Sequence, residues 1–416
     1  MVLIRRLLCG TGGAALSLLA PSALVAQNIP RELPTLGIPE DEFVPTPIHV
    51  GGANVYLGGS ARFEYDDNIY AQASHAGELK INLVDDEKFI LRPFVSVADT
   101  GHAIEFTGKA EGDFRKYVHH DKESANGGQV STNTTWHMTA NDGLSLDADW
   151  QHAIEDRGEP EARVVTSIGP RESNNYMGNL TYSHQGGRIG FTLQGAINAY
   201  RYLSEVDRVR NLTDYGLQAR VSHRITPIAS AFVEGFLQDR NFQREDGEVN
   251  RDSNTYGAHV GVAIDPGGSL RGDAAVGVYH FSPRDSTLKS RTGPSVQVGL
   301  IYQFRPRLAF NLDAFVGNVA TYTAGAQSRQ DTTLSFGAQQ EIRHNLRLQA
   351  SFIYRRYRYY GTGIVQNLYG GYGELEYVIN QRMTVAVDAR YSTRNSTAAL
   401  QDYNRFRTGI EFRFHY

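Results

Sequence analysis

Residues 54–65, NVYLGGSARFEY, decide the fold of this chain. Apolar or small side chains stand at the odd positions (Val55, Leu57, Ala61 and Phe63 among them), while Arg62 and Glu64 stand at even positions. Successive side chains of a β-strand point to opposite faces. The stretch therefore predicts a long strand with one apolar face and one polar face.

The same alternation recurs along the rest of the chain. It is clear at 174–184, where Tyr176 and Leu180 alternate with amides and hydroxyls, and again at 307–320. Beyond residue 26 the sequence contains no apolar run of about 20 residues, which a membrane-spanning helix needs. The composition agrees with a strand-rich protein, since 42 of the 416 residues are glycine and 23 are tyrosine. A helical multispan protein is therefore excluded.

The connections between the predicted strands alternate between short and long. The short ones have turn residues such as Gly, Pro, Asn and Asp, and they lie near 99–101, 141–143, 185–187, 225–227, 265–268, 305–306, 344–345 and 380–382. Nine longer polar stretches separate them, near 67–86, 119–128, 156–171, 201–210, 240–252, 282–291, 322–331, 359–366 and 394–402. Eight short and nine long connections join eighteen strands. Two strands are less regular, because Pro93 interrupts 87–98 and the alternation is mixed at 229–239, so sixteen strands is the alternative count.

Each strand–loop–strand unit repeats at about 40 residues, a period that propeller blades also have. A blade divides such a unit into four short strands, whereas here each unit holds two strands of about 12 residues. Strands of this length can cross a bilayer when they are tilted. The period therefore favours a membrane barrel over a propeller.

A sheet that spans a membrane must pair all its backbone groups, so it must close on itself. Short turns at one end and long loops at the other are typical of outer-membrane barrels, with the turns in the periplasm. We therefore predict an all-β fold, a transmembrane antiparallel up-and-down β-barrel over residues 52–416. Its location would be the outer membrane of a Gram-negative cell.

The N-terminal region reads as a signal peptide followed by a linker. Arg5 and Arg6 precede an apolar run at 7–20, and small residues before position 27 suit cleavage after Ala26. Residues 27–51 contain five prolines and no periodicity, which predicts a periplasmic lead-in. The only cysteine, Cys9, lies within the predicted signal peptide 1–26, so the exported chain would contain none.

The C-terminal strand offers an independent test of the membrane prediction. Phe412, Phe414 and Tyr416 form its apolar face, and an amphipathic last strand with a terminal aromatic residue is similar to the signal that the barrel assembly machinery reads. The expected partners are therefore that machinery and outer-membrane lipid. Tyrosines near strand ends, such as Tyr117, Tyr176, Tyr200 and Tyr279, are expected in the two interfacial girdles.

Once the apolar face is assigned to lipid, the other face lines the lumen. On the last four strands this face carries alternating arginines and acids, namely Arg347, Arg355, Glu374, Glu376, Asp388, Arg390, Arg407, Glu411 and Arg413. The opposite wall is more neutral, with Asn133, Asn175, Thr181 and similar residues. Arginine can bind carboxylates or phosphates and amides suit sugar hydroxyls, so a hydrophilic solute is expected. The alternatives are that these charges only pair across strands, or that Tyr357 and Tyr372 form a stacking surface for sugars.

Catalytic and metal sites are not predicted. The chain has no HExxH, CxxC, GxSxG or P-loop motif. His184 and His223 have outward parity near turns, where interfacial polar residues are common. Asp66-Asp67-Asn68 lacks the spacing of an EF-hand. We therefore predict a protein that is not an enzyme and has no cofactor, and the net charge of -4 argues against nucleic acid as a partner.

A known family shares the end of the first predicted strand. The segment Tyr65-Asp66-Asp67-Asn68, followed by Ile69 and Tyr70, resembles the "YDDN" signature that opens barrels of the outer-membrane beta-barrel porin type 2 family. The layout of 50–416 and the closing segment 407–412 are also similar. Many members are associated with capsule or exopolysaccharide assembly, so the resemblance implies an export role and supplies no catalytic residues.

Three functions follow from these observations. The first is a pore that takes part in export of an exopolysaccharide or capsular polysaccharide, together with periplasmic export proteins. The second is a diffusion porin for small hydrophilic or anionic solutes. The third is a structural surface barrel with a plugged lumen.

Overall fold

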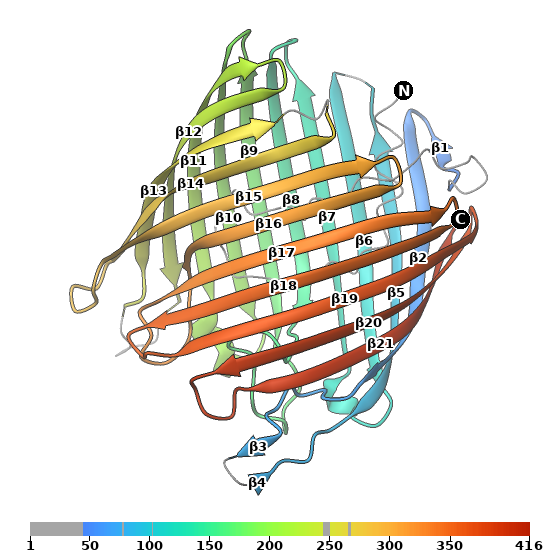
Figure 1. Ribbon diagram of the computed structural model, residues 1–416, viewed down its shortest axis with the longest axis vertical. Helices are drawn as coiled ribbons and strands as arrows, with labels where there is room; N and C mark the ends of the chain where they lie inside the picture. Colours follow the sequence, from blue (N-terminus) through green and yellow to red (C-terminus); the bar gives the residue numbers. More distant parts are fainter. Residues whose placement is uncertain (1–44, 77–78, 102, 244–249, 265–267) are drawn as a thin grey trace.

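The protein forms a closed antiparallel β-barrel of eighteen strands. The computed structural model describes residues 45–76, 79–101, 103–243, 250–264 and 268–416. Figure 1 shows the wall of the barrel from β2 through β21, and the strands on the near side cross those on the far side in this view. The predicted fold class and strand count are therefore confirmed.

The strands of the wall are long and of similar length. They are β2 (Ala53–Asp66), β5 (Asp86–Asp99), β6 (Ile104–Tyr117), β7 (Ala125–His137), β8 (Asp142–Ile154), β9 (Glu172–Gln185), β10 (Ile189–Tyr202), β11 (Leu212–Thr226), β12 (Ala229–Phe242), β13 (Ser253–Ile264), β14 (Leu270–Pro283), β15 (Arg291–Arg305), β16 (Leu308–Val319), β17 (Ser328–Arg343), β18 (Leu346–Tyr360), β19 (Val365–Asn380), β20 (Met383–Ser396) and β21 (Tyr403–His415). Short elements lie outside the wall: β1 (Ile48–Val50), β3 (His75–Ala76), β4 (Leu79–Lys80), and the 3-10 helices η3 (Asp121–Glu123) and η4 (Glu205–Arg210). No helix in the described residues is long and apolar enough to cross a membrane.

The barrel closes where the last strand pairs with the first. β2 and β21 are antiparallel over the register from Gly58↔His415 to Asp66↔Arg407. Because the strand number is even, β2 begins and β21 ends at the same end of the barrel. This end carries the short connections and is called the turn end, and the opposite end is called the loop end.

The alternation of connections follows the prediction. Eight connections of two to five residues join strands at the turn end, and nine connections join them at the loop end. Eight of these nine are longer, and the one between β18 and β19 has four residues. Residues 265–267 of one predicted turn lie outside the described residues. A shift of register precedes four of the two-residue turns, at 224/226, 303/305, 341/343 and 378/380, as expected for bulges at the rim of a barrel.

Both of the less regular strands form. Pro93 lies in β5, where it pairs with Gly59 of β2, while the pairs of β5 with β6 stop at Leu91↔Phe114 and resume at Phe94↔Glu111. Proline has no N–H for the ladder, so the gap falls at the proline without any change of register. Strand β12 is complete from Ala229 to Phe242.

The outer surface is apolar, as the parity requires. Phe412, Phe414 and Tyr416 of the predicted assembly signal are 48%, 46% and 73% exposed. Tyr176 and Tyr377 are also exposed on this face, which suits an interfacial girdle. The girdle prediction is wrong for Tyr117, Tyr200 and Tyr279, which are buried, because their parity turns them toward the lumen.

The Tyr65–Asn68 motif joins the first strand to the last at the loop end. Both Asp66 carboxylate oxygens accept hydrogen bonds from Arg405, and Asp67 accepts one from the backbone N–H of Phe406 at 2.7 Å. The Asn68 amide donates to the carbonyls of Gln72 and Asn404, each at 2.9 Å. The motif therefore holds the first and last strands together. Its side chains are used in these hydrogen bonds and do not form a calcium site.

The lead-in meets the barrel through a short hairpin. Residues 1–44, which include the predicted signal peptide and most of the lead-in, lie outside the described residues. Ile48–Val50 form β1, which pairs with Ala53–Val55 of β2 across Gly51 and Gly52. Gly51 has a φ of 62°, a backbone conformation that favours glycine.

Candidate functional site

A long loop crosses the lumen and defines the candidate site. Residues 155–171 connect β8 to β9, yet they contact β18, β20 and β21 and the connection after β16. These elements are on the other side of the barrel, since β8 and β9 are the fifth and sixth wall strands and β18–β21 are the last four. The loop therefore divides the lumen near the loop end.

Asp156 is the strongest anchor of this loop. Its Oδ1 lies 2.6 Å from Arg405 Nη1 and its Oδ2 lies 2.9 Å from Arg407 Nη1. Burial alone would raise the pKa of Asp156, but Arg405 and Arg407 outweigh that effect and hold the pKa well below its usual range. Asp156 is therefore ionised and bound to β21 at neutral pH.

Backbone carbonyls and a second acid extend the attachment. Arg394 Nη1 donates to the carbonyl of Glu159 at 3.2 Å, and Tyr403 donates to the carbonyl of Gly158 at 3.1 Å. Glu161 accepts hydrogen bonds from the Tyr322 backbone N–H at 2.9 Å and from Thr323 at 3.1 Å. Glu161 has a φ of 64°, which is strained for a residue other than glycine and is held by these contacts.

The loop is also braced internally. Arg157 is buried and donates to the carboxylate of Glu123 and to three carbonyls within the loop. Arg171 joins the two ends of the loop by contacting Glu155 at 2.7 Å, and it also contacts Asp207 of η4 at 2.7 Å. These contacts make the loop a preformed unit.

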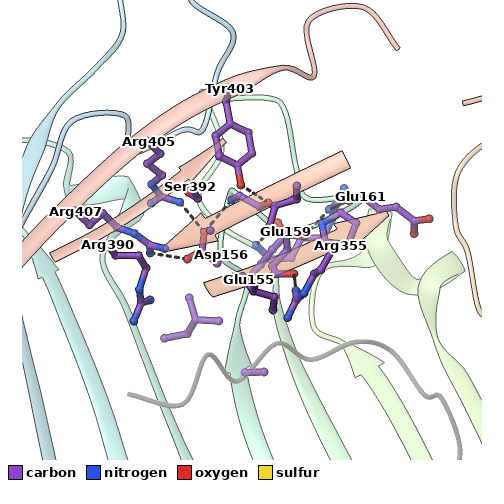
Figure 2. Close-up of a pocket in the computed structure, with 18 of the residues that line it drawn as sticks. Glu155, Asp156, Glu159, Glu161, Arg355, Arg390, Ser392, Tyr403, Arg405 and Arg407 are labelled. Atoms are coloured by element: carbon purple, nitrogen blue, oxygen red, sulfur yellow. Dashed lines mark hydrogen bonds and ion pairs between the residues drawn. The ribbon is translucent and has the colours of Figure 1, made fainter. Parts of the chain in front are cut away.

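Glu159 is the weakest attachment. Its Oε2 lies 3.7 Å from Arg355 Nη1, and its side chain is 28% exposed to the cavity. Desolvation raises the pKa of Glu159 to about 7, against the opposing effect of Arg355. Figure 2 shows Glu159 and Arg355 on one side of Asp156, with the arginines of β20 and β21 on the other.

A cavity of about 270 Å³ lies between the loop and the wall. Eleven of its lining residues are arginine or lysine and five are aspartate or glutamate. Four of those acids (Glu155, Asp156, Glu159 and Glu161) belong to the loop rather than to the wall. Several of the cations are paired with aspartates behind the lining, for example Arg62 with Asp388, Arg329 with Asp331 and Arg405 with Asp66. By contrast, the ion pairs of Arg355 and Arg407 are with the loop acids Glu159 and Asp156.

The nine predicted lumen residues divide into two groups. Six form ion pairs within the wall: Arg347 contacts Glu376 at 3.2 Å, Arg413 contacts Glu374 at 3.0 Å and Glu411 at 2.8 Å, and Asp388 pairs with Arg62. The other three, Arg355, Arg390 and Arg407, line the cavity. Tyr357 and Tyr372 are buried, and only Tyr372 lines the cavity.

Sequence reasoning placed a long connection at 156–171 but did not predict that it enters the lumen, nor that Arg394 and Arg405 are its wall partners. The stretch at 155–163 is dense in charge, with three glutamates, one aspartate and two arginines in nine residues. This density of charge is the feature of the sequence that indicates a loop with many polar contacts. It does not show which distant strand would bind the loop.

A second region of the lumen is filled by side chains. On β12, β13 and β15, Glu234 Oε1 lies 3.1 Å from His259 Nδ1, and His259 Nε2 lies 2.7 Å from Ser295 Oγ. This order of groups matches a catalytic triad. The adjacent cavity measures only about 30 Å³, which is room for about one water. The three side chains therefore pack the strands together and leave no space for a substrate.

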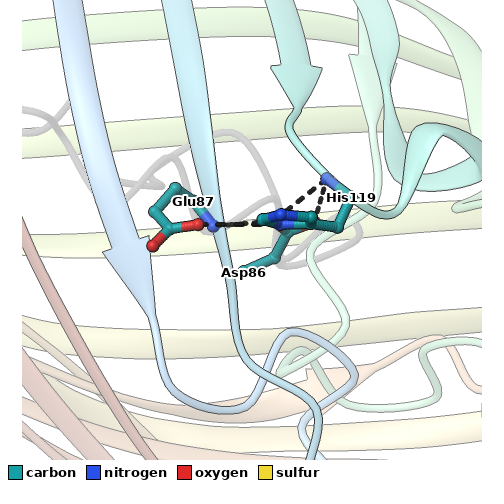
Figure 3. A group of neighbouring side chains, drawn as sticks. All are labelled: Asp86, Glu87 and His119. Atoms are coloured by element: carbon teal, nitrogen blue, oxygen red, sulfur yellow. Dashed lines mark hydrogen bonds and ion pairs between the residues drawn. The ribbon is translucent and has the colours of Figure 1, made fainter.

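Two histidines gather around one carboxylate at the rim. Asp86 lies within hydrogen-bond distance of both rings, at 2.9 Å from His119 Nδ1 and 2.9 Å from His120 Nδ1. Glu87 lies 3.7 Å from His119 (Figure 3). Asp86 also accepts hydrogen bonds from the backbone N–H groups of Glu87 and both histidines. Its lone pairs are therefore used to hold the connection after β6.

The fold and the lumen define an outer-membrane channel-type barrel. The family described as "Putative beta-barrel porin 2" matches residues 45–416. The chain therefore belongs to the beta-barrel porin 2 family, as the Tyr65–Asn68 motif predicted, and its location is the outer membrane. Members of a porin family are transport proteins rather than enzymes.

Two solved structures of outer-membrane proteins resemble the chain at low sequence identity. The siderophore receptor PirA from Acinetobacter baumannii has a TM-score of 0.41 at 9% identity, over 86% of this chain and 80% of that chain. OccK5 (OpdH) from Pseudomonas aeruginosa has a TM-score of 0.42 at 11% identity, over 87% of this chain and 98% of that chain. No curated protein shows significant similarity to the chain.

Proposed function

We propose that the protein is an outer-membrane channel for small hydrophilic anions, with its constriction between loop 155–171 and the arginines of β18, β20 and β21. Three wall arginines that line the cavity carry this proposal: Arg355 and Arg407, whose ion pairs are with the loop, and Arg390, which has no ion pair among the described residues. A lumen lined by one sign of charge concentrates ions of the opposite sign and favours their passage.

The size of the cavity supports small solutes rather than a polymer. Sites that bind small molecules measure about 300–1,000 Å³, and this cavity of about 270 Å³ is just below that range. A single sugar or a small organic acid fits such a space. A chain of several sugars requires the loop to leave the lumen.

Reversal potentials across a planar bilayer with a KCl gradient test this function. The wild-type channel should prefer chloride, and Arg355→Glu or Arg407→Glu should shift the preference toward potassium, because each reverses a charge on the cavity wall. Arg284→Glu is a matched control, since Arg284 lies outside the cavity and its side chain is 40% exposed. Equal reversal potentials for all four proteins contradict the proposal. A channel that never conducts supports the plugged structural barrel instead.

Export of exopolysaccharide or capsular polysaccharide with periplasmic partners is our second candidate, because the family resemblance implies it. One observation favours it: the loop is held to the wall mainly by ion pairs and hydrogen bonds, which water and a polar chain can replace. A deletion strain should then lose secreted polysaccharide, and a strain that secretes normally excludes this role.

A further inference from the structure

Four lumen-facing residues form one row across the last four strands. Ser351 of β18 pairs with Tyr372 of β19, Tyr372 pairs with Arg390 of β20, and Arg390 pairs with Arg407 of β21. Neighbouring strands are about 4.8 Å apart. All four residues line the cavity, so the row presents a hydroxyl, an aromatic ring and two cations in order.

Two arginines are directly opposite each other at one end of the row. Like charges in this arrangement destabilise a sheet. Arg407 is compensated by Asp156, but no ion pair joins Arg390 to a carboxylate in the part of the chain that the structure describes. The Arg390 guanidinium lies 5.1 Å from the centre of the Tyr372 ring. Its Nε is inaccessible to solvent and has no hydrogen-bond partner among the described residues.

Three other arginines of the lumen differ from Arg390 in having an ion pair. Arg347, Arg405 and Arg413 each contact at least one carboxylate. In Figure 2 the Arg390 side chain is beside that of Arg407, while the dashed lines gather around Asp156. A buried donor that has no partner is costly, and such strain is typical of ligand sites.

We propose that Arg390 and Arg407 bind the carboxylate of a small acidic sugar, whose ring lies along Tyr372 and whose hydroxyls reach Ser351. Arginine suits this role because its planar fork binds carboxylates through two hydrogen bonds. Aromatic rings suit the apolar face of a sugar, and the cavity has the volume for a single sugar unit. The inference rests on the proposed channel and names its solute class.

Glucuronate and glucose are suitable probes because they differ only in the carboxylate at one carbon. We expect glucuronate to interrupt the single-channel current and to raise the thermal midpoint of the wild-type protein, whereas glucose at the same concentration should do neither. Arg390→Gln should weaken the effect of glucuronate by about tenfold or more, the loss expected for a charge-assisted contact.

Arg347→Gln is the matched control, because Arg347 is a lumen arginine that Glu376 already pairs and that does not line the cavity. It should leave glucuronate affinity unchanged. Without ligand, Arg390→Gln should keep or raise the thermal midpoint, because it removes a repulsion from Arg407. A lower midpoint indicates a structural role and overturns the site.

The failure of this inference is distinct from the failure of the channel function. If the wild-type channel is anion-selective but glucuronate and glucose act alike, the channel stands and the binding row is wrong. If Arg390→Gln keeps full glucuronate affinity, the carboxylate binds elsewhere and the assignment is also wrong.

Discussion

The lumen contains two sectors that have the same strand pairing and the same apolar outer face, but differ in where their charges find partners. In the packed sector, the inward faces of β11–β16, partners come from neighbouring strands, as Arg240 contacts Asp214 at 3.0 Å. In the arginine sector, the inward faces of β18, β20 and β21, several partners come from loop 155–171. Where the charged side chains of the wall pair with one another, that part of the lumen stays closed. Where they pair with a loop, the lumen can open when the loop leaves.

Removing the loop aspartate that pairs with the arginine sector and a buried aspartate of the packed sector gives the largest expected difference. Asp156→Ala takes a carboxylate away from Arg405 and Arg407, so the loop should loosen and the single-channel conductance should rise severalfold. Asp214→Ala removes the carboxylate that contacts buried Arg240. Loss of one partner of a buried pair costs about 3–5 kcal/mol, so this variant should lower the thermal midpoint and leave the conductance unchanged.

Conductance traces and thermal melts of the two variants check this contrast. Folding of each variant is verified by its migration on a gel before and after heating, which distinguishes an intact barrel. If Asp214→Ala opens the channel as much as Asp156→Ala does, the packed sector is not sealed and the comparison fails.

The pH dependence of anion selectivity is a smaller effect in the arginine sector. Glu159 has a pKa raised to about 7, so with the loop in place it is neutral at pH 5.5 and ionised at pH 8. Arg355, Arg394, Arg407 and Asp156 are the charged groups that influence it. Because protonation removes one negative charge from the cavity, the preference for chloride should increase as the pH falls through 7.

The raised pKa also favours the seated loop at low pH. An exposed glutamate has an ordinary pKa of 4.5. Between that pH and about 7, Glu159 therefore keeps its proton only while the loop is bound to the wall. The free energy by which this proton favours the bound loop is lost as the pH rises through 7. Reversal potentials at pH 5.5 and 8 measure the change. Glu159→Gln should keep the low-pH selectivity at both values, and an unchanged pH response in that variant would show that another group titrates.

The sequence predicted the wall well because a membrane barrel imposes period-two alternation on every strand. Parity also placed Arg390 and Arg407 toward the lumen. It would have placed Tyr200 and Tyr279 there too, but their positions near strand ends suggested a girdle. Local pattern is therefore a better guide to the facing of a residue than its nearness to a strand end.

The loop could not be predicted in the same way. Residues 155–171 have no periodicity, and the contact of Asp156 with Arg405 joins positions 249 residues apart. The contact of His259 with Ser295 was hidden for another reason, because it passes over Gly277 of the intervening strand β14 and depends on the register of three strands. Closure and register of the barrel determine such contacts, and no single segment encodes them.

Cysteine accessibility tests the central claim most directly, because the only natural cysteine is Cys9 in the predicted signal peptide. Ser351→Cys places a thiol on the cavity wall of the arginine sector, and Ser295→Cys places one in the packed sector, where Ser295 is 5% exposed. The account predicts that a small negatively charged methanethiosulfonate reagent modifies the thiol at position 351 rapidly and reduces the current, while position 295 reacts only after unfolding. Equal reaction rates at the two positions in the folded barrel would contradict it.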